Sequence, residues 1–264
     1  EGFDLPVEWV VVEDDGTQRA SGVTDHRGVA DLLDPASDWQ QNPDNIVVTV
    51  PSRYVFTIAC EVPGRSAAQI RKALPFVIEE YLASDLDAVH LAFGDIRSGK
   101  PTICHVIERD VLQGWLEALR ATGLEPAWVL AEADLLQVTP DGATVLLEGA
   151  SALITSQHEV ALVDRANLAF ALSSFAGMNL AIINGALTAM ERASLSPDTS
   201  LVEASPQESG GSSAIGYLAS RLVSSPLPAN LLQGMFAPVR RHRESLRQWR
   251  LAGGLVASWF VVAV

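Results

Sequence analysis

Short apolar runs rich in β-branched residues, separated by turns, recur through the first half of the chain. Such runs are typical of β-strands. The Asp-Asp-Gly sequence at 14–16 predicts a hairpin turn between the first two runs. The predicted strands cover residues 7–12, 18–23, 46–50, 54–62, 87–96, 101–107 and 128–130, and a short helix is predicted over 25–33.

The clearest helical pattern begins at Ser66, where Ser66 and Gln69 have the spacing of a capping box. Apolar residues then recur at spacings of three and four. Pro75 interrupts the helix and predicts a kink, because proline removes a backbone donor. The predicted core face consists of Ala67, Ile70, Leu74, Val77, Ile78, Tyr81 and Leu82.

A second amphipathic helix is predicted over 110–122, with Gly123 as its C-terminal cap. After a turn at 141–142, the order of strands followed by a helix repeats, which indicates two α/β lobes with mixed sheets. The expected elements are strands at 144–148, 151–156, 160–163 and 180–183, helices at 167–175 and 214–223, and a mobile loop at 194–213 that is rich in Ser, Pro, Gly and Glu.

The C-terminal segment changes abruptly from basic to apolar. Its arginines are Arg240, Arg241, Arg243, Arg247 and Arg250, and an uncharged apolar run follows from Leu251 to Val264. Arginines beside a membrane helix mark its cytoplasmic side, so the preceding body is expected to be cytoplasmic. The run is shorter than the ~20 residues that cross a bilayer. It is therefore either the start of a membrane anchor, which the arginine flank favours, or a short buried helix ending a soluble domain.

Charge divides the chain into two unlike parts. The five arginines and Glu244 give residues 240–250 a charge of +4. Because the net charge of the whole chain is −14, the remaining residues carry a charge of −18. Such an acidic body is expected not to bind nucleic acid, whereas the arginine segment suits an anionic membrane surface. The two cysteines, Cys60 and Cys104, lie in apolar strands without metal-ligand spacing, so we expect buried free thiols.

Motifs for catalysis are missing from the sequence. There is no Walker-type loop, no Gly-x-Gly-x-x-Gly and no Gly-x-Ser-x-Gly elbow. The first hairpin offers Asp14, Asp15 and one glycine, Gly16, which we interpret as a turn. The five histidines are scattered, and His90 with His105 is expected to form a structural pair across adjacent strands. No catalytic, cofactor-binding or metal-binding residue is therefore assigned.

Four sequence marks carry a family resemblance. Val62-Pro63-Gly64 is followed by Arg-Lys-Ala-Leu-Pro-Phe-Val-Ile-Glu-Glu at 71–80 and Asp-Ala-Val-His at 87–90. In the segment from Trp115 to Pro126 a helix ends in Gly-Leu-x-Pro. Asn-Leu-Leu-Gln-Gly stands at 230–234, before the basic segment. In this order and spacing, the chain resembles the L component of the bacterial type II secretion system.

The resemblance implies an actin-like (ribonuclease H-like) α/β fold of two lobes with an inserted small subdomain. The expected division is a first lobe at 1–62 and 108–135, the insertion at 63–107 and a second lobe at 136–237. Residues 238–250 would be the basic juxtamembrane segment, and 251–264 the start of a transmembrane helix.

The resemblance also implies a role without catalysis. Members recruit the cytoplasmic secretion ATPase, through its N-terminal region, to the inner membrane and link it to the other platform proteins. It implies a single-pass inner-membrane protein and allows a homodimer. For the ATPase contact we expect the charged face of the 66–82 helix, which carries Arg65, Arg71, Lys72, Glu79 and Glu80.

Three other functions compete with this one. The related type IV pilus protein has the same fold, but it is wholly cytoplasmic and keeps nucleotide-binding residues. A kinase- or chaperone-type enzyme would need Asp14, Asp15 and Gly16 as its magnesium and phosphate site. A single-pass signalling receptor is disfavoured because no kinase or cyclase motif is visible.

Overall fold

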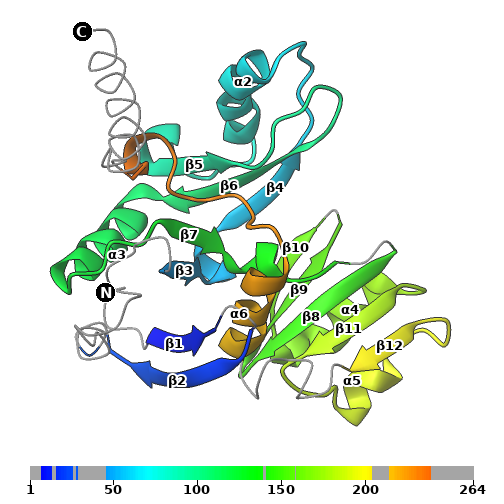
Figure 1. Ribbon diagram of the computed structural model, residues 1–264. Coiled ribbons are helices and arrows are strands. Elements are labelled where there is room, and N and C mark those ends of the chain that lie inside the picture. The colour runs from blue at the N-terminus through cyan, green and yellow to red at the C-terminus, as the bar shows by residue number, and fades with distance from the viewer. Residues whose placement is uncertain are drawn as a thin grey trace, which may run out of the picture.

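The computed structural model describes residues 7–13, 16–25, 28, 46–138, 141–157, 159–203 and 214–238. Within these ranges the chain forms two lobes and a smaller subdomain, built around separate β-sheets (Figure 1). Most of the helix expected at 25–33 lies outside the described residues, as do the arginine segment and the apolar run after it. No helix among the described residues is long and apolar enough to cross a membrane.

The second lobe is a five-stranded sheet with the order β10-β9-β8-β11-β12. The first three strands of the lobe pair antiparallel, whereas β11 runs parallel to β8 and β12 parallel to β11. The strands are β8 (Gly142–Glu148), β9 (Ser151–Ser156), β10 (Val160–Asp164), β11 (Asn179–Ile183) and β12 (Ser200–Glu203).

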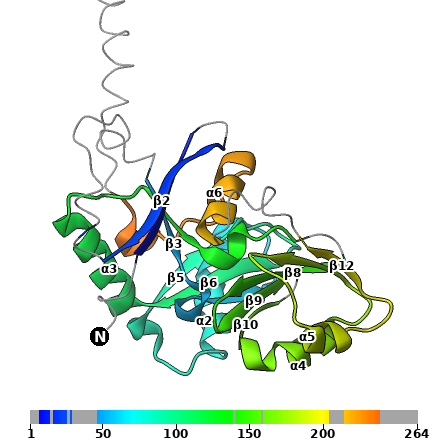
Figure 2. The same ribbon diagram turned by 90° about the horizontal axis from the view of Figure 1, so that it is seen from below.

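Helices cover both faces of this sheet (Figure 2). Because side chains alternate along a strand, Val145 and Leu147 face α4, whereas Leu146 faces α6. This alternation gives the lobe two separate apolar cores. The helices are α4 (Leu168–Leu172), α5 (Ala189–Ala193) and α6 (Ala214–Ser224).

The loop predicted at 194–213 is wrong in its first half. Residues Ser200–Glu203 form β12, which pairs with β11 from Asn179↔Ser200 to Ile182↔Glu203. The sequence pattern missed this strand because a short edge strand needs few apolar residues. The rest of the predicted loop, 204–213, lies outside the described residues.

The first lobe combines a hairpin with a parallel strand pair. The hairpin joins β1 (Val7–Val12) to β2 (Gln18–Thr24), as predicted, and its Gly16 has a φ of 83°. Strand β3 (Val47–Val50) runs parallel to β7 (Trp128–Ala131), and α3 (Arg109–Ala121) leads into β7. Gly123, at φ 86°, ends α3 as predicted: its N–H and that of Leu124 bond back to the last turn.

A three-stranded sheet belongs to a subdomain that interrupts the first lobe between β3 and α3. Its order is β4-β6-β5, with β4 (Phe56–Cys60), β5 (Val89–Phe93) and β6 (Thr102–Glu108), and α2 (Ala67–Glu79) packs on one face. The expected division placed β4 in the first lobe, but β4 pairs with β6. We therefore propose that the inserted subdomain begins at β4 rather than at residue 63.

A strap at Asn230–Phe236 ties the first lobe to the inserted subdomain. The Asn230 side chain accepts from Val129 N at 3.0 Å and donates to Ala127 O at 2.8 Å, next to β7. Three residues later, the Gln233 amide donates to Phe93 O at 2.9 Å and accepts from Phe93 N at 3.3 Å, on β5. The Asn-Leu-Leu-Gln-Gly motif thus forms a junction between two sheets.

Replacing Asn230 with alanine should loosen this junction. The substitution leaves the buried backbone groups at Ala127 and Val129 without their side-chain partner, which costs about 1–3 kcal/mol. Chemical denaturation should show this loss. The control is Asn179→Ala at an exposed position on β11, which should change stability by less than about 0.5 kcal/mol. Equal stability of the two variants would show that the strap is held by its apolar residues alone.

Candidate interaction surface

Helix α2 starts at a well-defined cap. The Ser66 hydroxyl accepts from Gln69 N at 3.3 Å, as the sequence predicted. The Gln69 side chain accepts from Arg65 N at 3.2 Å, one residue before the position that a capping box would use. Both contacts fix the first turn, so the side chains that follow have defined directions.

The inner face of α2 fixes the helix on its sheet. Ile70, Leu74 and Ile78 are almost completely buried, and they pack with Val89 and Val106 of the sheet below. The prediction that Tyr81 belongs to this face is wrong, because Tyr81 lies beyond the end of α2 and is 58% exposed. Its spacing fits the helix period, but the helix ends before the period reaches it.

The outer face of α2 combines charge with an exposed aromatic ring. Lys72, Phe76 and Glu79 are spaced four and three residues apart, so they share one side of the helix. All three are exposed, and Phe76 is exposed to 70%. Sequence reasoning named the two charges but missed Phe76. An exposed aromatic ring with charges around it is typical of a protein interface.

Arg71 differs from the other charged residues expected at this surface. Its guanidinium lies 5.4 Å from the centre of the Phe93 ring and donates to Gln233 Oε1 at 3.5 Å. Arg71 therefore contacts β5 and the strap from the edge of α2. The remaining expected residues, Arg65 and Glu80, are exposed at the two ends of the helix.

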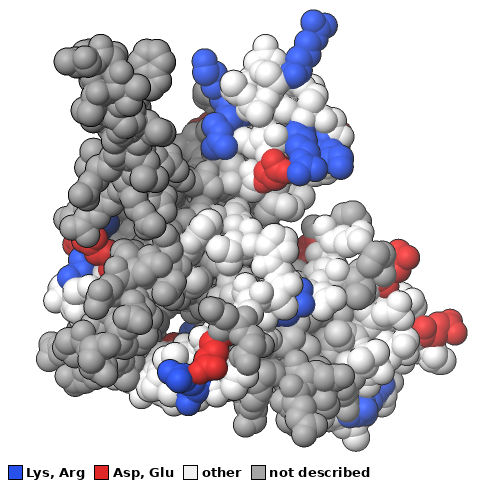
Figure 3. Space-filling view, viewed as in Figure 1, with Lys and Arg blue, Asp and Glu red and all other residues white. Residues whose placement is uncertain are grey.

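Basic side chains gather on the inserted subdomain, as the visible face in Figure 3 shows. The turn between β5 and β6 adds Arg97 and Lys100, both exposed. Ser98 in this turn donates to Gly64 O at 2.6 Å, which places the turn beside Arg65. This face of the subdomain thus presents a group of basic side chains on a chain whose net charge is −14.

The predicted histidine pair is replaced by two separate contacts. His90 Nε2 lies 2.7 Å from Leu231 O of the strap, and burial lowers the pKa of His90. His105 Nδ1 lies 3.1 Å from the Thr57 hydroxyl, and its Nε2 lies 2.9 Å from Asp134. Both histidines connect the inserted subdomain to neighbouring segments, so a structural role fits each of them.

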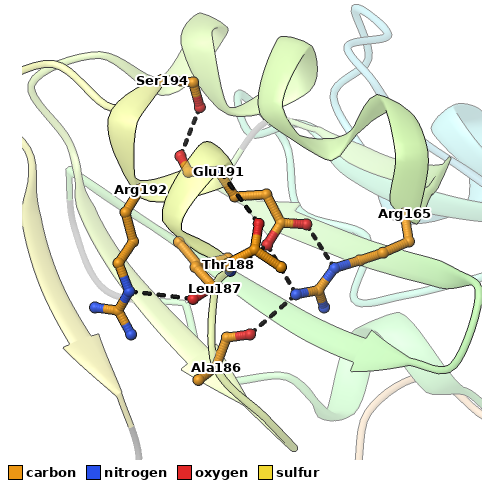
Figure 4. A network of polar contacts seen from close by, with 7 residues as sticks. All are labelled: Arg165, Ala186, Leu187, Thr188, Glu191, Arg192 and Ser194. Carbon is orange, nitrogen blue, oxygen red and sulfur yellow. Dashed lines mark hydrogen bonds and ion pairs between the residues drawn. The ribbon is translucent and has the colours of Figure 1, made fainter.

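At the N-terminus of the short helix α5 in the second lobe, side chains of the protein bond to backbone N–H groups (Figure 4). Thr188 caps the helix and Glu191 bonds back to Thr188 N at 2.7 Å, which forms a complete capping box. Arg165 donates to both oxygens of Glu191, at 2.6 and 2.8 Å. Two N–H groups at this helix start are thus bonded within the protein, that of Thr188 to the Glu191 carboxylate and that of Glu191 to the Thr188 hydroxyl.

The hairpin turns of the two lobes also bear on whether the chain could bind a nucleotide. Asp14 and Asp15 lie outside the described residues. In the second lobe, Gly149 at φ 53° forms the turn between β8 and β9, and the Ser151 hydroxyl donates to Glu148 O. Among the described residues, no three His, Cys, Asp or Glu side chains are placed to hold a metal ion.

A family model for type II secretion system protein L matches residues 4–239. The chain belongs to the protein L family of the type II secretion system. Protein L of Pectobacterium carotovorum subsp. carotovorum is 24% identical over 265 residues, covering 98% of the chain but 59% of that relative. Protein L of Pseudomonas aeruginosa is 32% identical over 87 residues, or 33% of the chain. The chain thus spans a little over half the length of this first relative.

Two solved structures share the fold of this protein L family member. The cytoplasmic domain of EpsL, an inner membrane component of the type II secretion system of Vibrio cholerae, has a TM-score of 0.64 at 19% identity, over 88% of this chain and 94% of that one. A chain of the PilM–PilN type IV pilus biogenesis complex has a TM-score of 0.56 at 13% identity, over 85% of this chain and 97% of that one. The actin-like fold predicted from the sequence is confirmed.

Glu191→Gln should destabilise the second lobe at neutral pH. Burial would raise the pKa of Glu191, but hydrogen bonds from Arg165 and Thr188 outweigh it, and the pKa lies below its usual value of 4.5. A lowered pKa stabilises the fold above pH 4.5, and this contribution is lost as the pH falls below that value. The variant should therefore lose about 1–3 kcal/mol at pH 7, and the deficit should shrink toward pH 3.

Denaturant unfolding at several pH values measures this effect. The control is Glu125→Gln, at an exposed position, which should unfold like the wild type throughout. A deficit that stays constant between pH 7 and pH 3 would mean that the charge of Glu191 does not contribute.

Proposed function

We propose that this chain is the body of an inner-membrane platform protein that recruits the secretion ATPase and links it to the other platform proteins. The family match over residues 4–239 carries this proposal. The likeness to the cytoplasmic domain of EpsL supports a cytoplasmic position for the body. The acidic body and the arginine segment that follows it have the charge distribution of a protein held at an anionic membrane surface.

The body acts without catalysis in this proposal. A phosphate-binding lobe needs free backbone N–H groups at a helix N-terminus or a glycine-rich turn. In α5 the N–H groups of Thr188 and Glu191 are bonded to each other's side chains, and the turn after β8 contains one glycine, Gly149. These contacts favour an adaptor over a kinase-like enzyme or a nucleotide-dependent pilus protein.

The arginines at 240–250 and the apolar run to Val264 form the membrane-proximal part of the proposal. Their sequence favours a single-pass anchor with the body on the cytoplasmic side, since arginines are retained on that side of a membrane helix. Other platform proteins would then meet this chain beside the membrane.

The outer face of α2 is the proposed contact for the N-terminal region of the ATPase. Phe76 supplies an exposed apolar anchor, and Lys72 and Glu79 supply charges of both signs that select partner and register. Arg65 and Glu80 extend this face at its ends, and Arg71 holds its edge against the strap. The helix lies on an inserted subdomain, so a partner bound there leaves both lobes uncovered.

A double variant, Lys72→Glu with Phe76→Ser, tests this contact most cleanly. Both side chains are exposed, so the fold should stay intact while affinity for the purified ATPase N-terminal region falls at least tenfold. Arg71 is left unchanged because its substitution would also disturb Phe93 and Gln233. Titration calorimetry at two salt concentrations measures the affinity and its ionic part.

The matched control is Arg120→Glu, at an exposed position on α3, which should bind like the wild type. If the double variant keeps wild-type affinity and salt dependence, the ATPase binds elsewhere on the body, and the cleft between the lobes becomes the next site to test.

A further inference from the structure

A cleft of about 490 Å³ lies between the inserted subdomain and the second lobe. One wall is the segment Ser52–Thr57, which leads into β4, and the other wall includes Val160 and Leu162 of β10. Residues 82–84, which follow α2, also line it. Protein pockets that hold ligands have volumes of ~300–1,000 Å³, so this β4–β10 cleft has the size of a binding site.

Both walls of the cleft are formed by edge strands. Strand β4 is the first in the order β4-β6-β5, and β10 is the first in the order β10-β9-β8-β11-β12. Among the residues that the structure describes, neither strand pairs with another strand on its outer side. The outer side of an edge strand carries backbone N–H and C=O groups with which an added strand can pair. An extended segment in this cleft would therefore find backbone partners.

The cleft follows the backbone of β4 rather than one face of its sheet. Val55, Phe56 and Thr57 all line it, and Val55 is already extended, with φ −122° and ψ 110°. Successive side chains of an extended segment point to opposite faces, so three lining residues in a row place the cleft along the strand edge. Apolar side chains flank this edge, because Phe56 is 46% exposed and Leu162 is 42% exposed. The cleft thus offers backbone pairing and apolar contacts side by side.

Acidic side chains border the cleft. Glu108 lines it, and Asp85 and Glu159 are each next to a lining residue in the sequence. All three side chains are exposed. Negative charge around an apolar groove favours a partner segment that carries positive charge.

The basic side chains beside these acidic groups have partners within the protein. The guanidinium of Arg53, which lines the cleft, lies 5.9 Å from the centre of the Tyr54 ring. Arg109 follows Glu108 in the sequence and donates to Val89 O at 3.2 Å. These contacts hold both arginines on the wall, so an incoming basic segment can approach the acidic groups.

We propose that the β4–β10 cleft binds an extended basic segment, which flanks a membrane helix of another inner-membrane platform protein and adds a strand to β4. Lys and Arg accumulate in the cytoplasmic segments beside membrane helices, so such segments have the charge that the cleft complements. Apolar residues at alternate positions of the segment would face Phe56 and Leu162, and main-chain pairing would supply affinity. The choice of partner rests on the proposed function, in which the body is cytoplasmic and is linked to the other platform proteins.

Synthetic peptides test this proposal with the full chain. They cover the cytoplasmic segments beside the membrane helices of the other platform proteins of the same organism. Fluorescence anisotropy should show that at least one basic peptide binds, and added salt should weaken its binding because exposed charges are screened. The same peptide with a central proline should bind at least tenfold less tightly, since proline removes a backbone donor. The original peptide should slow hydrogen exchange in β4 (Phe56–Cys60).

Two double variants separate the apolar part of the cleft from its charged part. Phe56→Ser with Leu162→Ser should lower the affinity for the peptide at least tenfold, because both apolar contacts are lost. Glu108→Lys with Glu159→Lys should weaken binding at low salt and remove its salt dependence. Circular dichroism checks the fold of each variant.

The matched control is Glu125→Lys with Asp198→Lys, at exposed positions that do not line the cleft, and it should bind the peptide like the wild type. Affinity for the ATPase N-terminal region is a separate readout on every variant, and its loss with peptide binding kept would count against the ATPase contact alone. The cleft proposal is overturned if no basic peptide binds, or if the Phe56 and Leu162 variant keeps wild-type affinity. It is also overturned if a peptide of residues 239–250 of the chain itself binds more tightly than every platform peptide.

Discussion

The side chains of Asn230 and Gln233 join parts of the chain that are distant in sequence. Asn230 bonds to both sides of Trp128 at the edge of β7, and Gln233 bonds to both backbone groups of Phe93 on β5. An amide side chain offers a donor and an acceptor together, so each residue can pair with a strand edge as another strand would. These bonds add to the contacts that His90 and His105 make from the inserted subdomain to the strap and to Asp134.

This junction gives the family's Asn-Leu-Leu-Gln-Gly mark a physical meaning. Leu231 and Leu232 are buried in the core beneath α3, while the flanking amides fix the two sheets. Arg71 reaches the same Gln233 from α2, so the proposed partner surface is bonded to the strap. The strap in turn precedes the arginine segment in the sequence, so this hydrogen bond links the proposed ATPase contact to the segment that leads to the proposed membrane anchor.

The sequence predicted best those elements whose signals are local. The cap at Ser66, the stop at Gly123 and the hairpin at Gly16 depend on a few neighbouring residues, and all three are present. The pairing of β4 with β6 and the strand β12 depend on distant partners, so the sequence pattern did not predict that pairing and missed β12.

The candidate sites show the same division. Charges on α2 were predictable from helical spacing, but the separate role of Arg71 depends on Phe93 and Gln233, which only the fold brings close.

Hydrogen exchange of the chain, alone and with the N-terminal region of the secretion ATPase, tests the adaptor account most directly. The account predicts that binding slows exchange in α2 and leaves the β8–β9 turn and the β1–β2 hairpin unchanged. Slower exchange confined to these two turns, with α2 unaffected, would contradict it.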